Sequence, residues 1–214
     1  MAFRFPAPGT GGPLFRTLLR NVKSKFPTIR YWIDAEDNVV RVNDEGESFA
    51  AENDGGPVGP AVGILGQPLW TFIRDASLRT LYREMVILAR NGQPVDFSFR
   101  CDAPRWRRVF RMRLTGEKTG VVEFASTLES EEAREAVSLL DCRQPRDERY
   151  VRMCSWCQLV EVHGLWVPVE AAVVELGLMA APSLPAITHT LCDGCNRRVM
   201  SQISALESGA QGQR

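Results

Sequence analysis

Four of the six cysteines in this chain of 214 residues form two pairs with the same spacing. Cys154 and Cys157 make the first pair, and Cys192 and Cys195 make the second. Zinc binds four soft donors at the corners of a tetrahedron, and a Cys-x2-Cys turn supplies two neighbouring corners from one backbone loop. Two such turns predict a closed site with four cysteine ligands. Because the protein supplies every ligand, we expect the metal to be structural rather than catalytic.

The spacing of the cysteines leaves other chemistries open beside zinc, which we favour. A single iron on four cysteines would make an electron carrier, and spacing alone does not separate iron from zinc. A Cys-x2-Cys pair can also perform thiol exchange. The oxidoreductases similar in this motif place it after a strand of a βαβ unit, however, and residues 150–153 do not look like such a strand. Reversible oxidation that releases zinc is a further sensor chemistry open to these thiols.

Charged residues and a histidine near the pairs could tune the site. His189 lies three residues before Cys192 and could replace a cysteine ligand, although a position beside the ligands or on the surface is the favoured interpretation. Arg152, Arg197 and Arg198 could offset the net negative charge of zinc bound to four thiolates.

Few other residues are candidates for catalysis. The chain has two histidines, and His163 precedes Gly164 in a predicted turn where we expect no specific role. Cys101 ends a predicted buried strand face and Cys142 ends a predicted helix, so both are expected to be small hydrophobic residues. No nucleophile–base pair, phosphate-binding loop or carboxylate dyad can be placed in the sequence. We therefore expect that this protein is not an enzyme.

The charges of the chain balance, with 26 Lys plus Arg against 26 Asp plus Glu. A general nucleic-acid binder carries a positive surplus, so this balance argues against nucleic acid as a partner. One basic strand is expected to be the outer face of a sheet, paired with acids of a neighbouring helix or a second subunit, with phosphate contact as the less favoured alternative. The arginines are Arg105, Arg107, Arg108, Arg111 and Arg113, and the candidate acids are Glu129, Glu131, Glu132 and Glu135.

The apolar stretches of the chain are short. None reaches the roughly 18–20 residues that span a bilayer, and the N-terminus lacks an apolar core followed by a cleavage site. We expect a cytoplasmic protein with no membrane span. The reducing cytosol argues against a disulfide framework and in favour of metal binding.

Periodicity predicts two strands, then helices, then three strands. The long helix at 75–91 carries an apolar face, follows Asp75 as a candidate N-cap, and is stopped by Gly92. Strand alternation is clearest where Val95 and Phe97 are separated by polar residues. The strands are expected at 31–33, 39–42, 95–101, 106–114 and from 122, with short helical turns at 44–54 and a loop at 55–66.

This order of elements resembles a PAS domain over residues 30–128. The resemblance rests on Ile33-Asp34, Val40, Val42-Asn43, Phe49, residues 62–72, and the run 97–104 followed by Arg108, Arg111 and Met112. It implies an α+β fold, with a five-stranded antiparallel sheet, flanking helices and a pocket between them, in a sensory or dimerisation module.

PAS domains hold flavin, haem, metabolites or nothing, so the resemblance leaves the ligand unknown. The absence of cysteine from residues 59–73 argues against a flavin–cysteine photocycle, and the absence of histidine from 75–91 argues against a histidine-ligated haem.

The segments outside residues 30–128 complete the predicted organisation. We expect a flexible leader with a basic amphipathic helix at 1–29, and a connecting helix at 131–141 plus a charged linker within 129–149. A small C-terminal metal-stabilised module at 150–199, built around a helix at 169–179, precedes a disordered tail at 200–214. The module resembles four-cysteine modules attached to PAS domains in bacterial regulators, on Met153 to Cys157, Trp166, and His189 to Cys195.

Together these observations predict a cytoplasmic bacterial signal-transduction protein, a homodimer acting through partner proteins, with the helix at 131–141 carrying the conformational change. The alternatives are a transcriptional regulator that binds DNA through the four-cysteine module, or an iron-containing redox protein.

Overall fold

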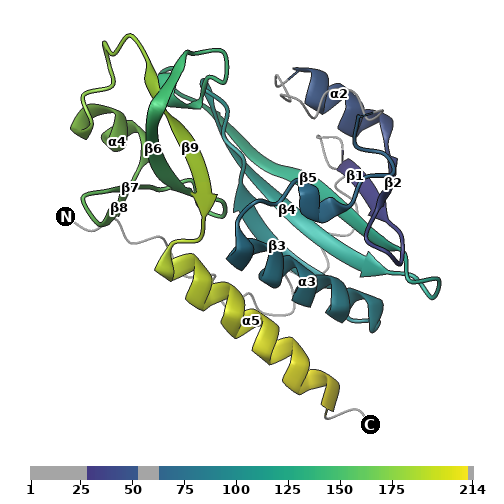
Figure 1. Cartoon of the computed structure of the whole chain (residues 1–214). Coiled ribbons are helices and arrows are strands. Elements are labelled where there is room, and N and C mark those ends of the chain that lie inside the picture. Colours follow the sequence, from purple (N-terminus) through teal and green to yellow (C-terminus); the bar gives the residue numbers. More distant parts are fainter. Residues whose placement is uncertain (1–27, 53–62, 212–214) are drawn as a thin grey trace, which may run out of the picture.

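The computed structural model describes residues 28–52 and 63–211, which form an α+β structure with two β-sheets (Figure 1). The first sheet lies in the N-terminal part of the chain, and the second lies beside it in the C-terminal part. The leader and amphipathic helix predicted at 1–29 lie outside the described residues except for Thr28 and Ile29, which belong to the first strand instead. Most of the loop predicted at 55–66 also lies outside them. Within the described residues, no helix combines the length and apolar character that crossing a membrane requires.

The first sheet has five antiparallel strands in the order β2-β1-β5-β4-β3. Buried and more exposed side chains alternate along its strands because one face of the sheet is buried. In β3, Val95 and Phe97 point into the core while Ser98, between Phe97 and Phe99, is exposed. The predicted five-stranded antiparallel sheet is therefore confirmed. The strands are β1 (Thr28–Ile33), β2 (Val39–Val42), β3 (Val95–Arg100), β4 (Trp106–Gly116) and β5 (Val122–Ala133).

Helices flank this sheet as predicted: α2 (Asp44–Glu52), the short 3-10 helix η3 (Leu69–Thr71) and α3 (Ala76–Arg90). The Asp75 carboxylate accepts a hydrogen bond from the Leu78 amide at 2.9 Å, which caps the start of α3. Leu78, Leu81 and Met85 of α3 are buried against the sheet. Burial of this apolar stripe fixes the helix on the sheet.

The second sheet has the order β8-β7-β6-β9, with β6 and β9 parallel. Its own core includes the fully buried Leu139, Met153 and Val160. The predicted helix around 169–179 is present as α4, although it is shorter. The elements are β6 (Arg146–Cys154), β7 (Val160–Val162), β8 (Leu165–Val167), α4 (Val169–Glu175), β9 (Leu184–Thr190) and α5 (Asp193–Gln211).

The connecting helix predicted at 131–141 is wrong. Strand β5 continues to Ala133, and only one short 3-10 helix, η4 (Ser138–Leu140), follows it. The acidic residues favour the strand because Glu131 pairs across the sheet with Arg108, and the Arg108 Nε–Glu131 Oε2 distance is 2.7 Å. Cross-strand opposite charges stabilise a sheet as i,i+4 pairs stabilise a helix. Cys142 consequently ends no helix.

Two further expectations on the C-terminal side are also wrong. Residues 150–153, which did not look like a strand, belong to β6, and β6 also takes in part of the charged linker from Arg146 onward. The predicted disordered tail at 200–214 is helical as far as Gln211. Helix α5 lies along α3 (Figure 1), where Val199 and Ile203 are buried. Gln93 Nε2 also donates a hydrogen bond to the Leu206 carbonyl at 3.4 Å.

Candidate metal centre

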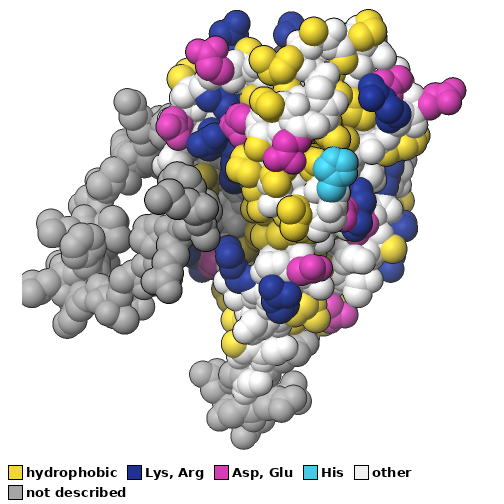
Figure 2. Space-filling model, turned by 90° about the vertical axis from the view of Figure 1, so that its left-hand side faces the viewer, with side chains coloured by type: hydrophobic (Ala, Val, Ile, Leu, Met, Phe, Trp, Pro, Cys, Tyr) yellow, Lys and Arg dark blue, Asp and Glu magenta, His cyan; other side chains and the backbone are white. Residues whose placement is uncertain are grey.

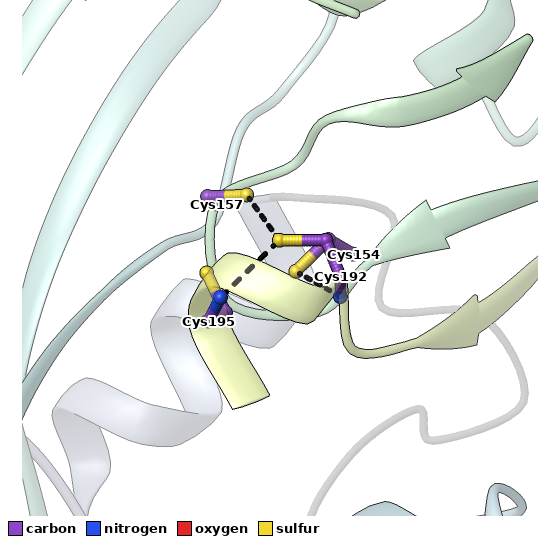
Figure 3. Close-up of side chains that lie close together, drawn as sticks. All are labelled: Cys154, Cys157, Cys192 and Cys195. Carbon is purple, nitrogen blue, oxygen red and sulfur yellow. Dashed lines mark hydrogen bonds between the residues drawn. The ribbon is translucent and has the colours of Figure 1, made fainter. Parts of the chain in front are cut away.

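The fold brings the four paired cysteines together. Cys154 is the last residue of β6 and Cys157 lies in the turn after it, while Cys192 directly precedes α5 and Cys195 lies in its first turn. All four Sγ atoms lie within 4.8 Å of one another, and their side chains converge on one point (Figure 3). The parallel pairing of β6 with β9 explains this, because the pairing ends with Cys154 opposite Thr190. The two Cys-x2-Cys segments therefore follow neighbouring strand ends.

The sulfur spacing fits a tetrahedral ion. The Cys157 Sγ–Cys192 Sγ distance is 3.8 Å. A zinc–sulfur bond of about 2.3 Å in tetrahedral geometry places two sulfurs about 3.8 Å apart. A disulfide, by contrast, needs about 2.05 Å between its sulfurs, and all four cysteines are free thiols. The set of donors is soft and closed, so these residues fit zinc or a single iron.

Backbone hydrogen bonds hold the sulfurs in place. The Cys192 amide donates to Cys154 Sγ at 3.3 Å, and the Cys195 amide donates to Cys192 Sγ at 3.4 Å (Figure 3). The Ser155 amide donates to the Thr190 carbonyl at 2.8 Å, which ties the first turn to β9. Amide donors also favour the thiolate form, because they stabilise negative charge on sulfur.

The close approach of the four thiols couples their ionisation. Hydrogen bonds from the neighbouring thiols of Cys157 and Cys195 hold the pKa of Cys154 far below its usual value. The hydrogen bond that the Cys157 thiol gives to Cys154 raises the pKa of Cys157 to about 12. Four thiols in such a small volume cannot all ionise without a cation between them. A bound metal would remove this repulsion, and its binding would release protons.

The cysteine cluster is packed into the same core as the first sheet. Trp156, between the first two cysteines, is 5% exposed. The centroid of its ring lies 4.4 Å from the ring centroid of Phe97 in β3. Arg100, also in β3, donates its amide to the Trp156 carbonyl at 2.9 Å and its Nη1 to the Cys157 carbonyl at 3.2 Å. Cys154, Cys192 and Cys195 belong to the same buried cluster as the first sheet. The two modules thus share one core at this point.

The other sequence candidates lie outside the cluster. His189 is in β9, paired with Met153 of β6, and is not among the converging ligands. Arg152 forms an ion pair with Glu161 at 2.7 Å, so its charge is already paired with a carboxylate. Cys101 and Cys142 are exposed, not buried as small hydrophobic residues. His163 occupies the turn between β7 and β8 with a positive φ of 51°.

A buried ionic network beside the metal centre was not found from the sequence. Asp102, with a side chain that is 0% exposed, contacts Arg100 and also lies 3.1 Å from Nη1 of Arg134. The Arg134 Nη1 atom lies 3.0 Å from Oε1 of Glu170 in α4, and Arg107 Nη2 lies 2.7 Å from the same oxygen. The network therefore connects the first sheet to the second module. Its only sequence signal is Asp102 in a turn among arginines.

The basic strand is paired with acids, as expected, but they lie mainly on the neighbouring strand rather than on a helix or a second subunit. Besides the Arg108–Glu131 pair, Arg111 lies 3.9 Å from Glu129 of β5. Arg107 also lies 3.9 Å from Glu132. These acids account for the charge of the strand without phosphate.

Neither protein-family models nor curated proteins match this sequence. Several solved structures are similar to parts of this chain at low identity. An HTR-like protein domain from Haloarcula marismortui is 14% identical, with 49% of this chain and 99% of that chain covered and a TM-score of 0.33. The RpfR quorum-sensing receptor PAS domain of Cronobacter turicensis, in complex with C12:0, is 19% identical, with 51% and 100% covered and a TM-score of 0.35. A sensory box sensor histidine kinase of Vibrio cholerae is 12% identical, with 55% and 90% covered and a TM-score of 0.35.

The fold and the site together define a class of protein. The five-stranded antiparallel sheet with flanking helices is a PAS-like fold. The cysteine cluster on its C-terminal side could hold a metal ion. The molecule is thus a PAS-like module packed on a four-cysteine module.

Proposed function

We propose that this protein is a cytoplasmic bacterial signal-transduction protein, in which a PAS-like sensor module controls a zinc-stabilised four-cysteine module. It acts through a partner protein, as a homodimer, and has no catalytic activity of its own. The observation that carries this proposal is the packing of Trp156 on Phe97. A metal module with a separate role would not need to share its core with the sensor sheet.

The contact between the modules offers a direct path for a signal. A connecting helix is absent from residues 131–141, so the change we expected it to carry needs another route. Arg100 lies at the end of β3 and hydrogen-bonds the carbonyls of both Trp156 and Cys157. A shift of β3 would therefore move the turn that holds two of the four ligands. The four-cysteine module would transmit this movement to its surface.

The surface of the second module supports a protein partner. Large hydrophobic side chains are exposed on it, and such groups on a soluble surface are typical of interaction sites. Figure 2, viewed from the side of this module, shows hydrophobic side chains gathered over the face with charged groups around them. The exposed residues are Tyr150, Leu165, Val174 and Met179.

The identity of the metal separates this proposal from a redox protein. We expect protein purified without air to be colourless and to contain one zinc per chain, because zinc has a filled d shell and no visible transitions. The measurements are a visible absorption spectrum and atomic emission on the same sample. Visible bands together with stoichiometric iron would contradict zinc and favour the electron carrier. Bands of flavin or haem would instead identify a ligand of the PAS-like module.

Coupling between the modules can be measured by amide hydrogen exchange. Removing the metal with a chelator under reducing conditions is expected to speed exchange of the Arg100 amide at least about tenfold, because its acceptor is the Trp156 carbonyl. The amides of β1 and β2, at the other side of the sheet, serve as the internal reference and should change little. Unchanged protection of Arg100 in the metal-free protein would refute the proposed coupling.

A further inference from the structure

A cavity of about 910 Å³ lies between the two modules. Its volume falls within the range of about 300–1,000 Å³ that is typical of small-molecule sites. One wall comes from the first module and the other from β6 and β9 of the second. The lining includes Tyr31, Arg74, Tyr82, Tyr150, Ser155, Ile187 and Thr188.

Two phenol groups in the wall are available to a ligand. Burial raises the pKa of Tyr82 to about 12 and raises the pKa of Tyr31 well above its usual value, so both remain protonated donors at neutral pH. Neither hydroxyl forms a hydrogen bond with any residue that the structure describes. Neither oxygen is among the fully enclosed atoms without a partner, so both hydroxyls are accessible from the cavity that their side chains line. An oxygen acceptor on a bound molecule would satisfy both groups.

The charge in the cavity wall favours an acid. Arg74 lines the cavity and forms no ion pair within residues 28–52 and 63–211. The neighbouring carboxylate of Asp75 is already engaged, because it caps helix α3 through the Leu78 amide. The formal charges of Arg74 and Asp75 cancel, but the Arg74 guanidinium is available to a carboxylate on a ligand, whereas Asp75 is held by the helix amide. Leu69, Phe72 and Ile187 supply apolar surface for the rest of a ligand.

The second wall of the cavity leads directly to the metal centre. Ser155 lines the cavity and lies between Cys154 and Cys157 in the first metal-binding turn. Thr188 lines it from β9 and pairs with Arg152 in β6, two residues before the first ligand. A molecule in the cavity would contact the strands that end at both cysteine pairs.

We propose that this cavity binds a small aromatic carboxylic acid, and that its occupancy is coupled to retention of the metal. The proposal rests on the zinc-stabilised module proposed above. The acid accepts hydrogen bonds from Tyr31 and Tyr82, and its ring packs between the apolar residues of both modules. Binding requires β6 and β9 in their metal-bound positions. By linkage, a ligand that needs the metal must stabilise the metal by the same factor.

The test uses the full-length zinc-loaded chain and 2-naphthoate as the probe. Spectra of methyl-labelled Leu and Ile are recorded during titration, and saturable shifts are expected at Leu69 and Leu78 in one wall and Ile187 in the other. Tyr31→Phe and Tyr82→Phe should each weaken binding about tenfold or more, since each loses a hydrogen bond to a charged acceptor. Thr80→Val is the control, because the exposed Thr80 hydroxyl lies on α3 outside the cavity lining and donates to the Ala76 carbonyl, so its removal should leave the affinity within about twofold.

Absence of saturable shifts, or shifts confined to the first module, would overturn the shared site. Transfer of zinc to a chromophoric chelator then tests the coupling. Saturating 2-naphthoate should slow transfer at least about fivefold in the wild type and leave the Tyr31→Phe/Tyr82→Phe variant unaffected. Probe binding with an unchanged transfer rate would overturn the coupling. Because zinc content is measured first, a failed titration on zinc-loaded protein overturns this inference and leaves the proposed function standing.

Discussion

Replacing Cys154 by serine is expected to abolish stoichiometric metal binding and to unfold the second module, while most of the PAS-like sheet persists. Structural zinc contributes on the order of 10–16 kcal/mol of apparent folding free energy in zinc-finger peptides. A serine hydroxyl has nearly the shape of the thiol but is a poor zinc ligand. Changes outside the ligand shell already cost 10–100-fold in affinity, so loss of a ligand should cost more than about 100-fold.

The result is measured as zinc per chain by atomic emission and as loss of dispersed amide signals from β6 to β9. Cys142→Ser is the matched control, because Cys142 is exposed and lies outside the cluster. It should keep its metal and its spectrum. If the Cys154→Ser protein binds zinc as tightly as the wild type, the four-cysteine centre is wrong. The PAS-like sheet should persist because most of the buried residues in the shared core, among them Ile33 and Phe124, come from its own strands and from α3.

The cysteine cluster could be predicted from the sequence because the Cys-x2-Cys spacing is a local pattern that occurs twice. Identical spacing in two places limits the backbone to turns that converge on one ion. The PAS-like sheet was also accessible, because alternation in β3 and the apolar stripe of α3 each reflect one buried face. Asp75 was identified as a cap for the same reason, since capping depends on neighbouring residues alone.

The failures share a physical cause, which is that the deciding partner is distant in sequence. The acidic segment after residue 128 has the composition of a helix start, but the arginines of β4 make it a strand. Strand β6 carries many charged residues and is a strand because it pairs with β9. Helix α5 continues past residue 200 because Ile203 is buried beside α3. Tertiary contacts outweighed local propensity in each case.

The sequence also did not show which residues connect the two modules. Trp156 within a metal-binding turn gave some signal, because a tryptophan in a solvent-exposed turn would be unusual. Asp102 gave almost none, since an aspartate in a turn is usually solvated. The structure instead buries its carboxylate completely and surrounds it with arginines. A charge in that position determines stability, and its removal has a large expected effect.

Asp102→Asn is expected to destabilise the protein by about 3–5 kcal/mol, because breaking a buried ion pair leaves its partner charges uncompensated. The change keeps the size of the side chain and removes the charge that faces Arg100 and Arg134. Arg134 is 8% exposed, and its Nε has no hydrogen-bond partner among the described residues. Water therefore cannot replace the Asp102 carboxylate as a partner of the Arg134 guanidinium. The free energy of unfolding, from urea denaturation at neutral pH, measures the effect.

The same substitution at an exposed position separates burial from charge. Asp96 contacts Arg111 at 3.3 Å on the open face of the sheet, where both side chains are accessible to water. Asp96→Asn should therefore cost no more than about 1 kcal/mol, as exposed ion pairs do. Equal effects of the two variants would mean that the Asp102 network adds nothing beyond an exposed pair. Because Arg100 also donates to the Cys157 carbonyl, Asp102→Asn should in addition speed loss of zinc to a chelator, and Asp96→Asn should not.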